Sequence, residues 1–355
     1  PVEFDVPAPS ELIIVEGSIT NEDRAYQVIL TRALSIGADS LDRPPVENAQ
    51  VRLYDDQQNV EDFQYLGSGI YQTTGAIQGE IGRSYFIRIE LEDGTIIESE
   101  PDEMKPVGTI EDIRYELEER VVEENFTDVR KDVFNVFIDS DVGSGNGNFV
   151  RWRFTGTYRI ETNPEQRELI LPWSDLPLIA PRPCSGYVPG PHPSGSGTII
   201  IQVQPCTCCE CWVIENEVAP QLSDDQLVAD GQFNNVKVGE VPITSITLFD
   251  KYQVFVEQMS MTQRAFEFFK LIRIQKTEAS NIFQPPSGEL IGNVKAINSD
   301  TRVVGMFWSS AVTTQKVYIT KDDVPYNLVP FNTIEDSCLR EFLNATTTKP
   351  EEWED

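Results

Sequence analysis

The sequence predicts a mainly β protein, with an immunoglobulin-like β-sandwich at residues 11–105 and a larger β-rich domain at residues 106–340. Three observations predict this class. Short stretches that alternate apolar and polar residues recur between turn residues, as strands do. Only residues 262–278 show helical periodicity over several turns. A chain of 355 residues with 40% hydrophobic residues can bury two cores, at about 150 residues per domain.

The first domain is predicted from closely spaced short strands. They are expected at residues 12–19, 25–31, 49–54, 69–73, 84–91 and 95–99. Asp93-Gly94 is a strong hairpin signal between the last two. Such spacing is typical of an immunoglobulin-like sandwich. The region contains no cysteine, so side-chain packing alone must stabilise it.

The second domain is predicted to have longer strands. They are expected at residues 110–120, 132–139, 149–158, 198–204, 303–308 and 315–320. We interpret 132–139 and 149–158 as a hairpin around a glycine-rich turn. The acidic residues between Glu111 and Glu124 are expected to form a solvated face. Residues 164–197 are rich in Pro, Gly and Ser, which indicates a long irregular loop.

One helix is predicted at residues 262–278. Ala265, Phe268, Phe269 and Ile272 recur on one face, and Thr262 can cap the first turn. This face is expected to pack on a sheet. Phe266 falls outside the stripe, so we expect it to be exposed and treat it as a candidate contact with a partner protein.

The six cysteines can be interpreted as zinc ligands or as disulfide partners. They are Cys184, Cys206, Cys208, Cys209, Cys211 and Cys338. Residues 206–211 contain two interleaved C-x-x-C pairs, which zinc ribbons also use, but a second, separated pair is missing. An even count with two outlying members favours disulfides and an oxidising compartment, and leaves the pairing open. Tyr187, in the neighbouring loop, is a second candidate partner contact.

The charge of the chain excludes several partners. It has 28 basic and 58 acidic residues, a formal net charge of −30. Such a chain repels nucleic-acid phosphates and gains nothing from an anionic lipid surface. Its only histidine, His192, lies between two prolines. Because no known catalytic motif is present, we expect no catalytic residue and no enzyme activity.

Two weaker motifs supply candidate sites. Asp139, Asp141 and Asn148 lie at the start of a calcium-loop pattern, but Val150 occupies the position of its last glutamate. A strand-connecting turn is therefore the favoured interpretation, and Ca²⁺ is the only candidate cofactor. Asp39-Ser40-Leu41 matches the acceptor pattern for O-glycans on exported Bacteroidota proteins, which makes Ser40 a candidate glycosylation site.

The two ends of the chain are expected to lie outside the domains. No stretch of 18 apolar residues exists, so no membrane-spanning helix is predicted. Residues 1–10 are rich in proline and indicate an extended tether after a removed, lipidated cysteine. Residues 341–355 are predicted to be an acidic tail.

An ordered set of short motifs resembles a known family. The motifs are Leu12-Ile-Ile-Val-Glu-Gly-Ser-Ile-Thr20, Pro44-Pro-Val-Glu-Asn-Ala-Gln-Val51, Gly69-Ile-Tyr71, Gly82-Arg-Ser-Tyr85, Cys211-Trp212-Val213, Ala265-Phe-Glu-Phe-Phe269, Gly292-Asn293-Val294 and Val304-Gly-Met-Phe307. Together they resemble the Bacteroidota lipoproteins grouped as domain of unknown function 4249. The resemblance implies a lipid-anchored, surface-exposed outer-membrane protein, often encoded beside a TonB-dependent receptor, with no known catalytic residues.

These inferences lead to two expected functions. The first is a non-enzymatic accessory subunit of an outer-membrane β-barrel complex, which is a TonB-dependent or SusCD-like transporter or a machine for outer-membrane protein assembly or secretion. Its partners would be the barrel protein and associated lipoproteins. The alternative is a module that captures glycans or peptides, with Tyr187, Trp173 or Trp308 as stacking platforms.

Overall fold

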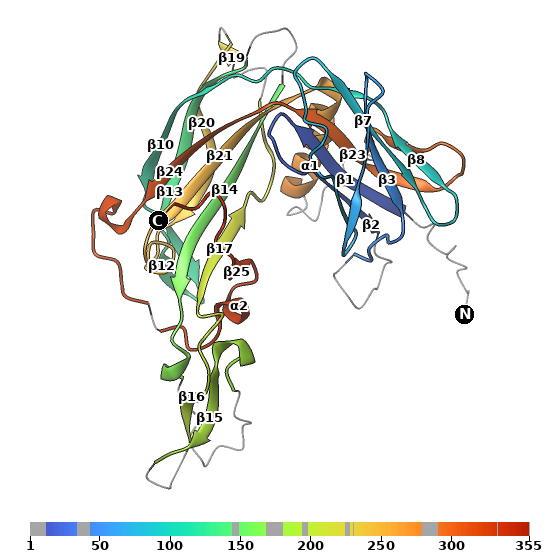
Figure 1. Cartoon of the computed structure of the whole chain (residues 1–355). Helices are drawn as coiled ribbons and strands as arrows, with labels where there is room; N and C mark the ends of the chain where they lie inside the picture. The colour runs from blue at the N-terminus through green and yellow to red at the C-terminus, as the bar shows by residue number, and fades with distance from the viewer. Residues whose placement is uncertain are drawn as a thin grey trace, which may run out of the picture.

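The computed structural model describes residues 12–33, 43–143, 149–167, 180–193, 198–223, 228–229, 231–278, 290–331 and 333–354. Two β-sandwiches diverge from a common joint, so the molecule has the shape of an arch (Figure 1). Helix α1 (Gln263–Glu278) lies between them, and a two-stranded arm extends from the second sandwich (Figure 1). The predicted mainly β class is confirmed.

The first sandwich is built from two mostly antiparallel sheets. One has the order β23 (Arg302–Ser310), β1 (Leu12–Thr20), β2 (Gln27–Arg32), β6 (Ile70–Gln72) and β5 (Gln64–Gly67). The other has the order β22 (Val294–Ala296), β8 (Ile96–Ser99), β7 (Ser84–Glu90), β3 (Gln50–Asp55) and β4 (Val60–Asp62), with β9 (Asp102–Glu103) paired to β7. Val15, Leu53 and Ile87 are fully buried between the sheets. Alternation along each strand thus places one apolar face inward.

The domain boundary predicted from the sequence is wrong in one respect. Residues 294–296 and 302–310 were assigned to the second domain, yet they form β22 and β23 and complete the first sandwich. β23 pairs in parallel with β1 from Leu12↔Arg302 to Thr20↔Ser310. Phe307 of β23 is fully buried in the first core. Alternation in a strand shows that one face is buried but does not identify the neighbouring strand. The pairing of residues 302–310 with the first strand of the chain was therefore not predicted.

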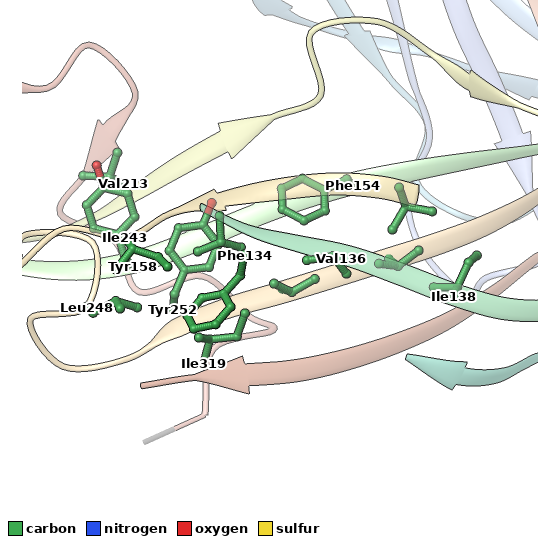
Figure 2. Close-up of a cluster of buried hydrophobic side chains, with 14 of the residues drawn as sticks. Phe134, Val136, Ile138, Phe154, Tyr158, Val213, Ile243, Leu248, Tyr252 and Ile319 are labelled. Atoms are coloured by element: carbon green, nitrogen blue, oxygen red, sulfur yellow. The ribbon is translucent and has the colours of Figure 1, made fainter. Parts of the chain in front are cut away.

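The second sandwich also has two sheets. One has the order β10 (Ile110–Glu118), β13 (Val133–Asp141), β20 (Gln232–Pro242) and β19 (Val228–Ala229). The other has the order β24 (Val312–Ile319), β21 (Tyr252–Met261), β14 (Phe149–Glu161), β17 (Glu210–Asn216) and β25 (Ala345–Thr346), with β18 (Gln221–Leu222) paired to β14. β11 (Val121–Glu124) and β12 (Thr127–Arg130) form a separate hairpin. Figure 2 shows Phe134 and Val136 of β13 within the core that also holds Phe154 and Tyr252.

The predicted hairpin of residues 132–139 and 149–158 is not formed. β13 pairs with β10 and β20, whereas β14 pairs with β17, β18 and β21. The two strands lie in opposite sheets and contribute to the same core. Each strand has an apolar face. The alternating sequence is compatible both with a hairpin and with two strands that pack face to face from opposite sheets.

Helix α1 forms as predicted and begins at its expected cap. The Thr262 hydroxyl accepts a hydrogen bond from the Ala265 N–H at 3.3 Å and donates one to Asp102 at 2.7 Å. The expectation that Phe266 is exposed is wrong: it is only 7% exposed and stacks on Phe149 with ring centres 4.5 Å apart. A helix between two sandwiches is covered on more than one side, so its apolar stripe is wider than a single sheet requires.

The joint between the sandwiches is a hydrogen-bonded crossing of strands. β23 runs into β24 through Ala311, which is fully buried. The Ala311 N–H donates to the Ser260 hydroxyl at 2.9 Å, and the Ser260 N–H donates to the Ala311 carbonyl at 3.0 Å. The buried Asp102 carboxylate accepts the Ser309 N–H at 2.9 Å. The bonds between Ser260 and Ala311 fix the two sandwiches to each other, and the bond from Thr262 to Asp102 adds a second link.

The C-terminal residues are not simply an acidic tail. α2 (Cys338–Glu341) is followed by β25, which pairs with β17 at Trp212↔Thr346. Trp353 is only 3% exposed, and the Lys251 ammonium lies 5.2 Å from its ring centre. The described part of this segment therefore folds against the second sandwich, because it carries apolar side chains between its acidic residues.

Replacing Gly305 with Ala is expected to weaken the pairing of β23 with β1. Gly305 has φ +138°, and a Cβ there would lie 1.9 Å from the Val15 carbonyl oxygen. We expect backbone strain and the clash to lower the free energy of unfolding by about 3 kcal/mol, measured by urea denaturation. Gly94→Ala is the control, because Gly94 has φ +84° but open space around it. Equal losses in both variants would contradict the close approach.

Candidate functional site

The arm is the most distinctive surface feature of the described chain. It comprises residues 183–193 and 198–209, with η2 (Pro183–Ser185), β15 (Tyr187–Pro191) and β16 (Thr198–Gln202). β15 and β16 are antiparallel, from Tyr187↔Gln202 to Pro191↔Thr198. They extend away from the second sandwich (Figure 1). An isolated two-stranded ribbon is marginally stable in water, so its base must be held by other interactions.

All six cysteines form disulfides, as the sequence favoured. The pairs are Cys184–Cys208, Cys206–Cys209 and Cys211–Cys338. Cys184–Cys208 joins the two ends of the arm across 24 positions, a loop whose closure entropy corresponds to about 3.5 kcal/mol in the chain-entropy model. Cys211–Cys338 attaches the C-terminal segment to the start of β17. The bonds therefore fix the base of the arm to the sandwich.

Backbone hydrogen bonds complete the base. The Thr207 N–H donates to the Cys184 carbonyl at 2.9 Å, and the Val203 N–H donates to the Gly186 carbonyl at 2.8 Å. Gly186 has φ +74°, and a Cβ there would lie 2.1 Å from the Gln204 carbonyl oxygen. Only glycine fits this close approach of the two chains.

Asp336 is the buried anchor of this base. Its carboxylate is 1% exposed and accepts the Arg182 N–H at 3.0 Å and the Ser337 N–H at 2.7 Å. The guanidinium groups of Arg167 and Arg340 bind the other oxygen at 2.6 and 2.7 Å. Burial opposes ionisation, but these donors outweigh it, so the pKa of Asp336 lies below its usual value.

One face of the arm is apolar and open to solvent. Val188 and Ile201 form a cross-strand pair and are 39% and 36% exposed. Val203, the residue directly after β16, is 62% exposed. Tyr187 lies on the other face. Its pKa is raised by partial burial and by the Glu165 carboxylate, which accepts its hydroxyl hydrogen bond. We name Val188, Ile201 and Val203 the apolar patch.

The arm is also free of formal charge. Residues 183–209 contain no Asp, Glu, Lys or Arg, although such residues make up 24% of the chain. Depletion of charged residues is the compositional sign of the buried core of a protein interface. Together with the exposed apolar patch, this depletion makes the arm a candidate binding surface.

Phe126 is an exposed apolar side chain outside the arm that was not predicted from the sequence. Phe126 is 98% exposed at the tip of the β11–β12 hairpin, where Asn125 and Phe126 have φ +49° and +63°. Positive φ at both loop residues is the conformation of a type I′ turn, and an asparagine between two β-prone stretches is its signal. A bulky residue in this conformation is strained, and such strain is concentrated at functional sites.

The predicted calcium ligands serve the structure of the second sandwich. Asp139 accepts the Asn235 N–H at 2.6 Å and an Arg114 guanidinium nitrogen at 2.7 Å, and these bonds lower its pKa. Asp141 accepts the Thr109 hydroxyl at 2.8 Å. Asn148 and the candidate glycosylation site Ser40 lie outside the described residues. Within the described ranges, no three acidic, His or Cys side chains are grouped as metal ligands.

The comparisons with known proteins identify a family. A family model described as Domain of unknown function (DUF4249) matches residues 1–316. The chain therefore belongs to this family, and the resemblance predicted from its motifs is confirmed. No curated protein matches the chain. Among the described helices, none has the length and apolar character to cross a membrane.

Asp336→Asn is expected to loosen the base of the arm. The change leaves a buried polar group between two guanidinium groups, so the free energy of unfolding should fall by about 3 kcal/mol at pH 7. Urea denaturation with intact disulfides measures this. Asp62→Asn is the matched control, because Asp62 is 71% exposed beside Arg52 and should change stability little.

The pH dependence has a defined sign. Because the folded pKa of Asp336 is lowered, its ionised form stabilises the fold above the unfolded pKa of about 4. That contribution is lost as the pH falls through the folded pKa. The difference between wild type and Asp336→Asn should therefore shrink only below about pH 4. A constant difference from neutral pH into strong acid would contradict the assignment.

Proposed function

We propose that this member of the DUF4249 family is a non-enzymatic accessory subunit of an outer-membrane β-barrel complex, lipid-anchored at the cell surface. The observation that carries the proposal is the uncharged, disulfide-bonded arm with its exposed apolar patch. The barrel belongs to a TonB-dependent transporter or to a machine for protein assembly or secretion. The outer-membrane setting comes from the family resemblance, and the arm supplies the docking element.

The chemistry of the arm fits a protein partner better than a lipid surface. Segments that rest on lipid headgroups carry Lys, Arg and several aromatic side chains. Residues 183–209 have no Lys or Arg, and Tyr187 is their only Tyr, Trp or Phe. Val188 and Ile201 instead present a small apolar face on a ribbon that the disulfides preorganise. Preorganisation reduces the entropy that binding must overcome.

The fold brings the two exposed elements to one end of the second sandwich. The joint lies at the end where Phe149 pairs with Met261. The β11–β12 hairpin follows Glu118, and the arm follows Glu161, at the opposite end of their sheets. Phe126 and the apolar patch thus belong to the end farthest from the joint. A partner that binds this end would contact both.

The negative charge is consistent with this placement. A net charge of −30 repels the anionic surface of an outer membrane. A lipid anchor would hold the chain close to that surface, while an uncharged arm could approach a barrel partner without electrostatic cost. The acidic strands would keep the remainder of the protein in solvent.

Capture of glycans or peptides is the alternative proposal, and the described residues give it less support. Trp308 is 5% exposed and belongs to the core under α1. Tyr187 is half-buried beside Glu165, and Trp173 lies outside the described residues. A stacking platform needs an exposed aromatic face, which neither described side chain provides.

Val188→Glu is expected to disrupt docking, because it would place an unpaired carboxylate in an apolar contact. Affinity purification of the tagged protein from its native membranes in mild detergent, with mass spectrometry, should recover a β-barrel protein with wild type and about tenfold less with the variant. Val60→Glu is the control, because Val60 is 51% exposed on β4 of the other sandwich. Wild type that purifies alone, or equal loss in both variants, would refute the proposal.

A further inference from the structure

A cavity lies between α1 and the outer face of the first sandwich. It has a volume of about 640 Å³ and is lined by residues of α1, β1, β2 and β23. This size lies within the range of small-molecule sites. The helix contacts β23 and, on its other side, β14, β18 and β21. The cavity extends from β23 across β1 and β2, away from the second sandwich.

The walls of the cavity are apolar. α1 contributes Phe268, Phe269 and Ile272, and β23 contributes Met306 and Trp308. The rings of Phe269 and Trp308 meet edge to face with centres 5.1 Å apart. Ile14, Ile29, Val304 and Leu290 add to the apolar lining, while Ser18, Gln27 and Gln275 contribute polar groups. Such a lining favours a hydrocarbon chain, since burying each CH₂ group contributes about 0.8 kcal/mol.

The charged side chains of the cavity mark its mouth. Arg43 and Glu16 have half-exposed side chains and form an ion pair at 3.5 Å. Lys276 is exposed, and its ammonium donates to the Val218 carbonyl at 2.7 Å. No carboxylate of the described residues lies within ion-pair distance of Lys276. Among the lining residues that the structure describes, two cations and one anion give the mouth a positive excess.

From this combination we infer that the cavity binds a long-chain carboxylate, with its hydrocarbon chain against Phe268, Phe269 and Trp308 and its head group at Arg43 and Lys276. The inference goes beyond the proposed function and does not depend on the arm. A positive mouth is notable in a chain with a net charge of −30. Non-specific association with this chain would favour cationic amphiphiles, so preference for the anion distinguishes a specific site.

Isothermal titration calorimetry with dodecanoate, below its micelle-forming concentration, tests the inference on the full chain. Dodecyltrimethylammonium, which has a chain of the same length and the opposite charge, is the comparison ligand. We expect dodecanoate to bind one-to-one and more tightly than the cation. Lys276→Gln should weaken dodecanoate binding up to about fivefold, the usual effect of one exposed ion pair. Arg273→Gln, on the same helix outside the cavity lining, should leave binding unchanged.

Ile272→Asp tests the apolar wall and should abolish binding, because it places a carboxylate beside the hydrocarbon chain. Circular dichroism and the melting temperature show whether this variant folds. If it does not, Lys276→Gln at an exposed position still decides the question. The inference is overturned if dodecanoate gives no saturable heat, if the cation binds more tightly, or if Lys276→Gln and Arg273→Gln have equal effects.

Discussion

The parallel pairing of β1 with β23 is the constraint on which the rest of the molecule depends. It joins residues 12–20 to residues 302–310, so the first sandwich is closed only after the second has been traversed. β23 continues through the buried Ala311 into β24, which pairs with β21 of the second sandwich. The same stretch of chain therefore belongs to both cores. Relative motion of the sandwiches would break the hydrogen bonds between Ser260 of β21 and Ala311 at the joint.

A rigid joint gives the arm a defined direction. β14 runs from the joint at Phe149 to Glu161, where the chain leaves the sheet toward the arm. Cys211–Cys338 and the Asp336 network then fix the base of the arm to the C-terminal segment. The three disulfides thus stabilise an element that is too small to bury a core. Fixed orientation and exposed apolar side chains are the properties that a docking element needs.

The sequence predicted local structure better than pairing. The alternation at residues 84–91 and the Asp93-Gly94 turn predicted β7 and β8, and Thr262 predicted the start of α1. The cysteine count favoured disulfides. The pairing partners of β13, β14 and β23 were not predictable, because an alternating pattern of apolar residues is compatible with any neighbouring strand that also has an apolar face. Phe266 is buried by the second sandwich, which a pattern within one helix cannot reveal. The lack of charged residues in the arm is visible in the sequence, but the solvent exposure of its apolar side chains can be seen only in the folded structure.

The proposed docking of the arm would bring Val188 into contact with a β-barrel protein in the native membrane. A photo-crosslinking amino acid at Val188, compared with the same group at Val60 of the first sandwich, tests it most directly. After irradiation of intact cells, mass spectrometry identifies the crosslinked protein. We expect a single major adduct with an outer-membrane β-barrel protein from position 188 and none from position 60. No adduct from position 188, or the same adducts from both positions, would contradict it.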